Sequence, residues 1–179
     1  MKPIELIGNT PMIQIGDSNV YVKLEGFNPG GSVKDRAALS MIEEAERSGR
    51  LSPGAVIVEP TSGNQGIGLA LIGAVKGYRT IIIMPDSVSE ERRKLVRHYG
   101  AEVILIHDAG NIGDCIEECL QTALRMQREN PKVFVPQQFS NPGNLEAHHY
   151  HTAVEILEQV AGPIHGFCSG VGTGGTISG

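Results

Sequence analysis

Short apolar runs alternate with longer helical segments over most of the chain. The run Thr80–Pro85 is apolar almost throughout, which is typical of a strand that is covered on both faces. Alternation of this kind predicts an α/β fold with a parallel sheet and helices on both of its faces. The expected strands are Val56–Pro60, Thr80–Pro85, Glu102–Ile106, Lys132–Pro136 and Ile164–Cys168, and the expected helices are 64–76, Ser89–Tyr99, Ile112–Arg128 and Leu145–Val160.

The N-terminal part has a different pattern. Pro11–Ile15 and Val20–Leu24 are expected to form two short strands, and Val33–Ser48 a helix that ends at Gly49. Pro and Gly cluster again at 141–144, which makes that segment the expected crossing point between two domains.

Composition and charge exclude several classes of protein. A length of 179 residues suffices for one ordinary domain, or for a small domain and part of another. The net charge of −5, and an aromatic content of 4% without Trp, argue against a nucleic-acid partner. The sequence shows neither a signal peptide nor an apolar stretch of membrane-spanning length. Three cysteines, an odd count, favour a cytoplasmic protein over one with a disulfide framework.

The segment Asn28–Arg36 places a lysine where a helix is expected to begin. Ser32 and Asp35 have the spacing of a capping box, which predicts a helix start at about Val33. Lys34 then lies in the first turn, where the positive end of the helix dipole lowers the pKa of an ammonium group. A neutral amine is what Schiff-base chemistry requires, and the alternative is an ordinary exposed lysine.

Hydroxyl and amide side chains cluster in the segment 59–66, between an expected strand and an expected helix. Free backbone N–H groups at a helix start bind anions such as a carboxylate or a phosphate. The alternative is a helix that is merely capped by Ser62 or Asn64. Because capping needs only one polar residue, the combination of Thr61, Ser62, Asn64 and Gln65 favours a ligand-binding loop.

A third loop, Ser169–Thr176, is rich in glycine and follows the last expected strand. Such a loop can present several backbone N–H groups to one phosphate. Gly170, Gly172 and Gly175 also match the dinucleotide-binding pattern, so a dinucleotide-binding module is an alternative of a different class. It is not a Walker A loop, because no Gly-Lys-Ser/Thr follows.

Taken together, these segments resemble the cysteine synthase (O-acetylserine sulfhydrylase) and cystathionine β-synthase family of pyridoxal-phosphate enzymes, which have fold type II. The matching motifs are Ile7–Pro11, Gly31–Arg36, Pro60–Asn64, Gln138–Pro142 and Gly172–Thr176, in the same order and spacing. The resemblance implies a small α/β domain at 35–140. It also implies that 1–34 and 141–179 form part of a larger cofactor-binding domain, the remainder of which is absent from this chain.

The resemblance further implies a role for each matching residue. Lys34 would form the Schiff base with pyridoxal 5′-phosphate and later take the substrate α-proton. Asn64 would hydrogen-bond the 3′-oxygen of the cofactor. The residues that would hold the 5′-phosphate are Gly172, Thr173, Gly174, Gly175 and Thr176, and those that would bind the substrate α-carboxylate are Thr61, Ser62, Gln65 and Gln138. The family usually has Thr in place of Gln65, and no metal site is implied.

The implied reaction is a β-replacement that makes L-cysteine from O-acetyl-L-serine, or O-phosphoserine, and sulfide through an α-aminoacrylate intermediate. A cystathionine β-synthase-like condensation of serine with homocysteine is the alternative within the family. Dehydratases of the same fold type usually carry Phe before the lysine, and Val33 argues against that branch. The family also implies a homodimer and serine acetyltransferase as a regulatory partner. Its chains continue well past the phosphate loop, so a further alternative is an inactive piece of the enzyme that binds the cofactor weakly or not at all.

The cysteines and clustered histidines fit structural roles. Cys115 and Cys119 lie on one apolar stripe of a helix and are expected in the core. Cys168 ends the last expected strand and is expected to be buried. The histidines at 148, 149 and 151 are expected at solvent or at an interface rather than on a metal.

Overall fold

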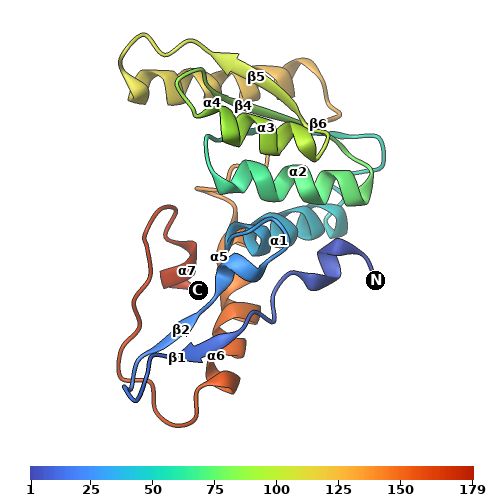
Figure 1. Cartoon of the computed structure of the whole chain (residues 1–179). Helices are drawn as coiled ribbons and strands as arrows, with labels where there is room; N and C mark the ends of the chain where they lie inside the picture. The colour runs from blue at the N-terminus through green and yellow to red at the C-terminus, as the bar shows by residue number, and fades with distance from the viewer.

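The computed structural model describes all residues from 1 to 179. Its main sheet has four parallel strands in the order β5-β4-β3-β6 (Figure 1). The strands are β3 (Val56–Pro60), β4 (Arg79–Pro85), β5 (Glu102–Ile106) and β6 (Val133–Phe134). The predicted α/β fold with a parallel sheet is therefore confirmed.

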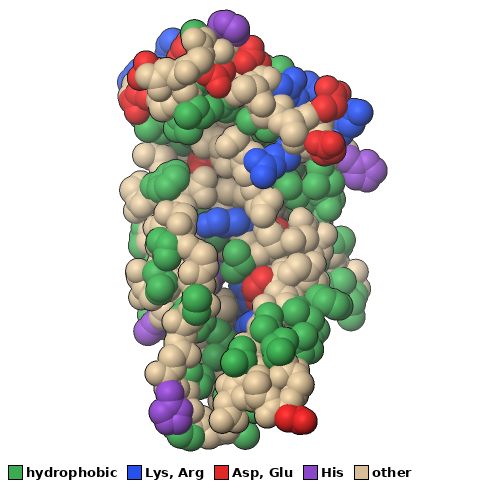
Figure 2. All heavy atoms as spheres, turned by 60° about the vertical axis from the view of Figure 1, so that its left-hand side comes forward, with side chains coloured by type: hydrophobic (Ala, Val, Ile, Leu, Met, Phe, Trp, Pro, Cys, Tyr) green, Lys and Arg blue, Asp and Glu red, His purple; other side chains and the backbone are tan.

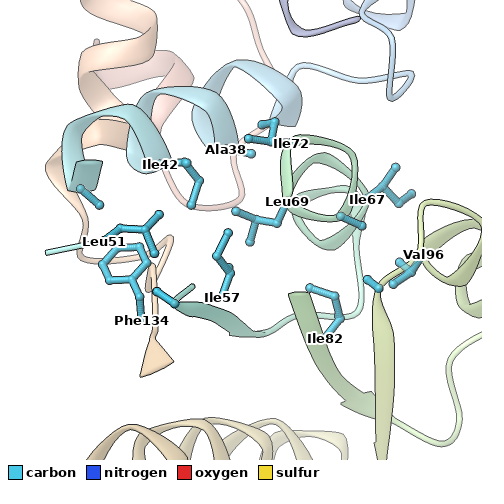
Figure 3. Packing of buried hydrophobic residues seen from close by; sticks show 14 of the residues in the cluster. Ala38, Ile42, Leu51, Ile57, Ile67, Leu69, Ile72, Ile82, Val96 and Phe134 are labelled. Carbon is cyan, nitrogen blue, oxygen red and sulfur yellow. The ribbon is translucent and has the colours of Figure 1, made fainter. Parts of the chain in front are cut away.

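Helices cover both faces of this sheet. Four of them surround it, namely α1 (Lys34–Arg47), α2 (Asn64–Lys76), α3 (Glu90–His98) and α4 (Ile112–Glu129). Ile57 of β3 packs with Ile42 and Leu69 on the side of α1 and α2 (Figure 3). The next residue, Val58, points to the other face and packs in the cluster that contains Cys115 and Cys119 of α4. Both cysteines lie in the core, as predicted.

The remaining elements lie below the four-stranded sheet in Figure 1. They are η1 (Pro3–Leu6), β1 (Met12–Gln14), β2 (Tyr21–Lys23), η2 (Glu25–Phe27), α5 (Pro142–Ala147), η3 (His148–Thr152), α6 (Ala153–Gln159) and α7 (Gly175–Ser178). The strands β1 and β2 are antiparallel. Helix α1 packs against both α2 and α5, so it joins the two parts of the molecule. The domain division at 35–140 stays a prediction.

The predicted helix Leu145–Val160 is helical up to Gln159, but it is not one regular α-helix. It begins at Pro142, because the Asn141 side chain accepts a hydrogen bond from the Gly143 N–H at 2.9 Å and caps α5. A single π-helical turn, η3, separates α5 from α6.

The predicted strand Ile164–Cys168 is wrong. This segment has no regular secondary structure, and Ile164, Phe167 and Cys168 are exposed. A strand needs a neighbouring strand to satisfy its backbone groups, and no other strand of the chain pairs with this segment. The prediction that Cys168 is buried is wrong for the same reason.

The predicted helix caps also differ from the observed ones. Asp35 accepts a hydrogen bond from the Gly30 N–H at 2.5 Å instead of closing a capping box with Ser32. Gly30 is required for this turn, since a Cβ there would lie 2.4 Å from Asp35 Oδ1. At α2 the N-cap is Gly63, so neither Ser62 nor Asn64 caps the helix.

Charged and hydrophobic side chains are distributed unevenly over the surface. Figure 2 shows more Lys, Arg, Asp and Glu over the upper part of the molecule and more hydrophobic side chains over the lower part. The exposed hydrophobic residues include Ile13, Val20, Leu157, Phe167 and Val171. None of the helices combines the length and the apolar character that crossing a membrane requires.

Candidate functional site

A cavity of about 340 Å³ brings the predicted lysine and the glycine-rich loop together. It is lined by Val33, Lys34, Gln138, Phe139, Gly170 and 172–176. Lys34 and all five residues predicted to hold the phosphate therefore share one cavity with Gln138. Three segments that lie far apart in the sequence meet at this place.

Lys34 is the first residue of α1 and therefore lies in its first turn, as the sequence predicts. Its Nζ donates a hydrogen bond to Thr173 Oγ1 at 3.2 Å, and this bond joins α1 to the glycine-rich loop. Burial lowers the pKa of Lys34, because desolvation disfavours the charged ammonium form. The direction agrees with the sequence prediction, which assigned it to the helix dipole.

The glycine-rich loop turns sharply before α7. Gly174 has a φ of +84°, which favours glycine, and it precedes the first residue of α7. Beside it, Thr176 Oγ1 lies 3.4 Å from Nε2 of His148. His148 is buried, contrary to the prediction, whereas His149 and His151 are exposed. Burial and the nearby Lys34 lower the pKa of His148 to about 4, so its imidazole is neutral at neutral pH.

The predicted carboxylate loop contacts the cavity through Gln138. Gln138 Nε2 donates a hydrogen bond to Thr61 Oγ1 at 3.4 Å, and Thr61 Oγ1 also accepts from the Gly63 N–H at 3.2 Å. On the other side of the loop, Arg92 of α3 donates to the Ser62 carbonyl at 3.2 Å. Thr61 and Ser62 are therefore held in place, although neither lines the cavity.

Asn64 and Gln65 occupy different environments at the start of α2. Asn64 is exposed, whereas Gln65 is only 1% exposed and neither polar atom of its side chain has a hydrogen-bond partner. Neither residue lines the cavity around Lys34. The structure thus brings Lys34, Gln138 and the glycine-rich loop together, and it places Asn64 and Gln65 outside that group.

Two polar residues at the site were not predicted from the sequence. Asn144 donates from Nδ2 to the Gln138 carbonyl and to Thr173 Oγ1, both at 2.8 Å. Glu59 accepts hydrogen bonds from the N–H groups of Gln137 and Gln138. Asn144 belongs to the Asn-Pro-Gly-Asn cluster, and Glu59 is a charged residue near the end of a buried strand. Neither signal reveals the hydrogen-bond partner of the residue.

A second cavity, of about 430 Å³, lies near the N-terminal segment. Its lining includes Gly8, Arg36, Glu43, Tyr150 and Glu155. The Arg36 guanidinium there is already paired with Glu25 and Glu155. The structure contains no group of three or more His, Cys, Asp or Glu side chains placed to hold a metal ion.

Comparison with known proteins identifies the family of this chain. The sequence model of a family described as pyridoxal-phosphate dependent enzymes matches residues 4–179. The chain belongs to this family of pyridoxal-phosphate dependent enzymes.

Within the family, the chain is similar to cysteine synthases. It is 47% identical to a cysteine synthase of Staphylococcus aureus, over 99% of this chain and 59% of the relative. It is also 47% identical to cysteine synthase B of Escherichia coli, over 98% of this chain and 58% of the relative. The chain thus spans somewhat less than three fifths of the length of these curated relatives.

Solved structures agree with this relationship. The crystal structure of cysteine synthase from Entamoeba histolytica is 41% identical with a TM-score of 0.90, over 99% of this chain and 54% of that chain. A hydrogen sulfide-producing enzyme from Fusobacterium nucleatum is 50% identical with a TM-score of 0.80, over 88% of this chain and 52% of that chain. The predicted fold type II resemblance is confirmed.

The residues at the cavity fit pyridoxal phosphate. The cofactor needs an amine for its aldehyde and an anion site for its phosphate. The Lys34 amine and the glycine-rich loop supply both within one cavity, and Lys34 Nζ lies 3.2 Å from Thr173 Oγ1 of that loop. A Cβ at Gly172 would meet no atom within 4 Å, so space is open beside this loop.

Proposed function

We propose that the protein catalyses a pyridoxal-phosphate-dependent β-replacement that makes L-cysteine from O-acetyl-L-serine, or O-phosphoserine, and sulfide. The observation that carries this proposal is the cavity that Lys34 shares with the glycine-rich loop and Gln138. The similarity to cysteine synthases supports the choice of reaction. The same similarity supports a homodimer, serine acetyltransferase as a partner and a cytoplasmic location as parts of the proposal.

Lys34 is the proposed catalytic residue. When bound, the cofactor supplies an electron sink for the bonds at the substrate α-carbon. Lys34 Nζ holds the cofactor and moves the proton of that α-carbon. Its lowered pKa suits this role, because only the neutral amine is a nucleophile or a base.

The glycine-rich loop is the proposed phosphate site. Backbone N–H groups of 172–176 and the hydroxyls of Thr173 and Thr176 supply donors without a cationic side chain. A phosphate has three terminal oxygens to accept such donors. The neutral His148 beside Thr176 leaves that hydroxyl free of a competing charge.

The loop at 61–65 is the proposed site of the substrate α-carboxylate. Gln138 Nε2 and Thr61 Oγ1 lie 3.4 Å apart, so both groups can donate to the same carboxylate once it replaces the bond between them. Ser62 and Gln65 add donors at the N-terminal end of α2, where the helix dipole favours an anion. Asn64 is the proposed partner of the cofactor's 3′-oxygen.

Borohydride capture tests the assignment of Lys34. The protein is incubated with pyridoxal phosphate, reduced with borohydride and digested for peptide mass analysis. We expect Lys34 to be labelled about tenfold more than Lys94, because the phosphate loop holds the aldehyde beside the first amine only. The Lys94 side chain is 71% exposed and serves as the internal control.

The Lys34→Ala variant completes this test. It should lose the dominant label and the turnover of O-acetylserine with sulfide to cysteine, while the weak labelling of Lys94 persists. Equal labelling of Lys34 and Lys94 in the unsubstituted protein would contradict the proposed function.

A further inference from the structure

We propose that Asn144 is a positioning residue that holds the phosphate loop and the substrate loop in one fixed arrangement. The proposal rests on the proposed function and extends it to a residue outside the predicted site. Asn144 lies on α5, beside the short helix α7 (Figure 1), and only 4% of it is exposed.

The amide of Asn144 uses both of its N–H groups. Nδ2 donates to the Gln138 carbonyl and to Thr173 Oγ1, each at 2.8 Å. Because a backbone carbonyl can only accept, Nδ2 must be the atom that faces Gln138, and this fixes the orientation of the amide. One planar group therefore sets the distance between the two loops.

The bond to Thr173 also determines what its hydroxyl can do. Thr173 Oγ1 accepts from Asn144 Nδ2 at 2.8 Å, from Lys34 Nζ at 3.2 Å and, more weakly, from the Gly175 N–H at 3.5 Å, so donors already occupy the lone pairs of the oxygen. Its own proton is then left to be donated. A hydroxyl that must donate suits an anion such as phosphate.

The bond to Gln138 extends the arrangement to the substrate loop. The Gln138 side chain donates to Thr61 Oγ1, whereas its backbone carbonyl accepts from Asn144. Gln138 therefore connects Thr61 to the hydrogen bonds that join Asn144, Thr173 and Lys34. A shift of either loop changes the bonds of Asn144, and this couples the two proposed binding sites.

Two steric and energetic facts support a role beyond packing. A Cβ at Gly175 would lie 2.5 Å from Asn144 Oδ1, so the phosphate loop has its glycine where the amide needs space. Asn144 Oδ1 is buried without a hydrogen-bond partner, which is unfavourable. An apolar side chain of similar size would avoid that cost, so the two donated bonds are what the asparagine provides.

The test compares the labelling of Lys34 by pyridoxal phosphate and by pyridoxal, which lacks the phosphate. Asn144→Leu and Asn144→Asp both remove the two donors, the first without adding charge. We expect the preference of Lys34 for the phosphorylated aldehyde to fall about tenfold in both variants. A role in packing alone would leave this ratio unchanged, so an unchanged ratio would overturn the proposal.

Variants of Thr173 test the hydrogen bond between Asn144 and Thr173 by removing its acceptor. Thr173→Val should lose the phosphate preference, and Thr173→Ser should keep it. The double variant Asn144→Leu/Thr173→Val should be no worse than Thr173→Val alone, because the shared bond is already gone. Additive losses would argue against the bond as the cause. As a matched control, Asn130→Asp changes an asparagine at the end of α4 and should leave the ratio unchanged.

Amide hydrogen exchange separates failure of this inference from failure of the proposed function. In Asn144→Leu without any cofactor, we expect faster exchange in both 137–141 and 172–176, with β3 and β4 unchanged. If Lys34 of the unsubstituted protein shows no selective labelling, the proposed function fails and the exchange result still judges Asn144. Faster exchange in one loop only, or in neither, would overturn the role of Asn144.

Discussion

Glu59 is a buried carboxylate without a cation beside it. It is 1% exposed and accepts hydrogen bonds from the N–H groups of Gln137 at 2.9 Å and Gln138 at 3.1 Å. Gln137 has a φ of +55°, which is uncommon for a residue other than glycine, and these bonds hold it there. Through them, Glu59 determines the position of Gln138 in the cavity.

Glu59→Gln should lower the free energy of unfolding by about 1–3 kcal/mol, because an amide nitrogen cannot accept a hydrogen bond, whereas both carboxyl oxygens can. One buried N–H would therefore lose its acceptor. Urea denaturation followed by circular dichroism measures this change. Ser140→Ala, at an exposed residue near the same turn, is the control and should leave the free energy of unfolding nearly unchanged.

The stability of the unsubstituted protein and that of Glu59→Gln should also depend differently on pH. Burial raises the pKa of Glu59 to about 7, above its usual 4.5, so the folded state binds this proton more tightly than the unfolded state does. The stability that this group contributes is full below about pH 4.5 and is lost as the pH rises through 7. The advantage of the unsubstituted protein over Glu59→Gln should therefore grow as the pH is lowered from 8 to 5, and parallel pH profiles would contradict the assignment.

Sequence reasoning singled out Lys34 and the loop 172–176, which the structure brings into one cavity, and it missed Glu59 and Asn144, which bond to residues at that cavity. Lys34 and the loop 172–176 stand in motifs whose chemistry can be read from residue type and spacing. Glu59 and Asn144 act through partners up to 79 residues away, and no local pattern indicates such a partner. The burial of His148 was missed for the same reason, since it depends on the packing of α7 against η3.

Helix α4 shows how a cap sets the start of an element. The Asn111 side chain accepts a hydrogen bond from the Gly113 N–H at 3.1 Å, and the helix begins at the next residue, Ile112. This helix covers one face of the sheet with Cys115, Cys119 and Ala123.

Asn111→Ala should lower the free energy of unfolding by about 1 kcal/mol, because a free N–H at the helix start loses its acceptor. Asn111→Ser keeps an acceptor at the same position and should be close to the unsubstituted protein. Thermal unfolding of the three proteins gives the comparison. Equal destabilisation by Ala and Ser would show that the cap is not the cause.

Elements with strong local signals were predicted well, and those that need a partner were not. The strands β3 and β4 follow from apolar runs that are largely buried, and β5 follows from a run that is only partly buried. The segment Ile164–Cys168 has a similar composition but lacks a neighbouring strand. The turn at Gly30 replaces the predicted capping box because Asp35 bonds backward to the loop, a choice that spacing alone does not reveal.

At the scale of the whole molecule, one buried arginine ties three separate segments together. Arg36, whose side chain is 3% exposed, donates to Glu25 at 2.7 Å and to Glu155 at 2.6 Å. It also donates to Thr10 Oγ1 at 3.2 Å. Lys23 pairs with Glu155 as well, at 2.7 Å. The start of the chain is thereby fixed to α1 and α6.

Arg36→Met should lower the free energy of unfolding by about 3 kcal/mol or more, because it leaves two partly buried carboxylates without their guanidinium. Adding Glu155→Gln should restore part of this loss, since the amide carries no charge. Denaturant unfolding measures both. If the double variant is no more stable than the single one, the charge of Glu155 is not what destabilises it.

Acid titration provides a second measurement on the same variants. Burial alone would raise the pKa of Glu155, but the bonds from Arg36 and Lys23 outweigh it and lower the pKa to about 2. Because this value lies below the usual 4.5, the stabilisation is present above pH 4.5 and is lost as the pH falls toward 2. Arg36→Met should lose less stability over this range than the unsubstituted protein.

The contacts of Glu155 and its neighbours also bear on the order in which the molecule is assembled. Asn9 donates to Glu155 across 146 residues, and Gln159 donates to the Thr10 carbonyl across 149. During synthesis, the first residues leave the ribosome long before these partners have been made. Closing so long a loop costs chain entropy before any contact is formed. We therefore expect the N-terminal segment to be among the last parts to reach its final place, after the sheet made by the middle of the chain.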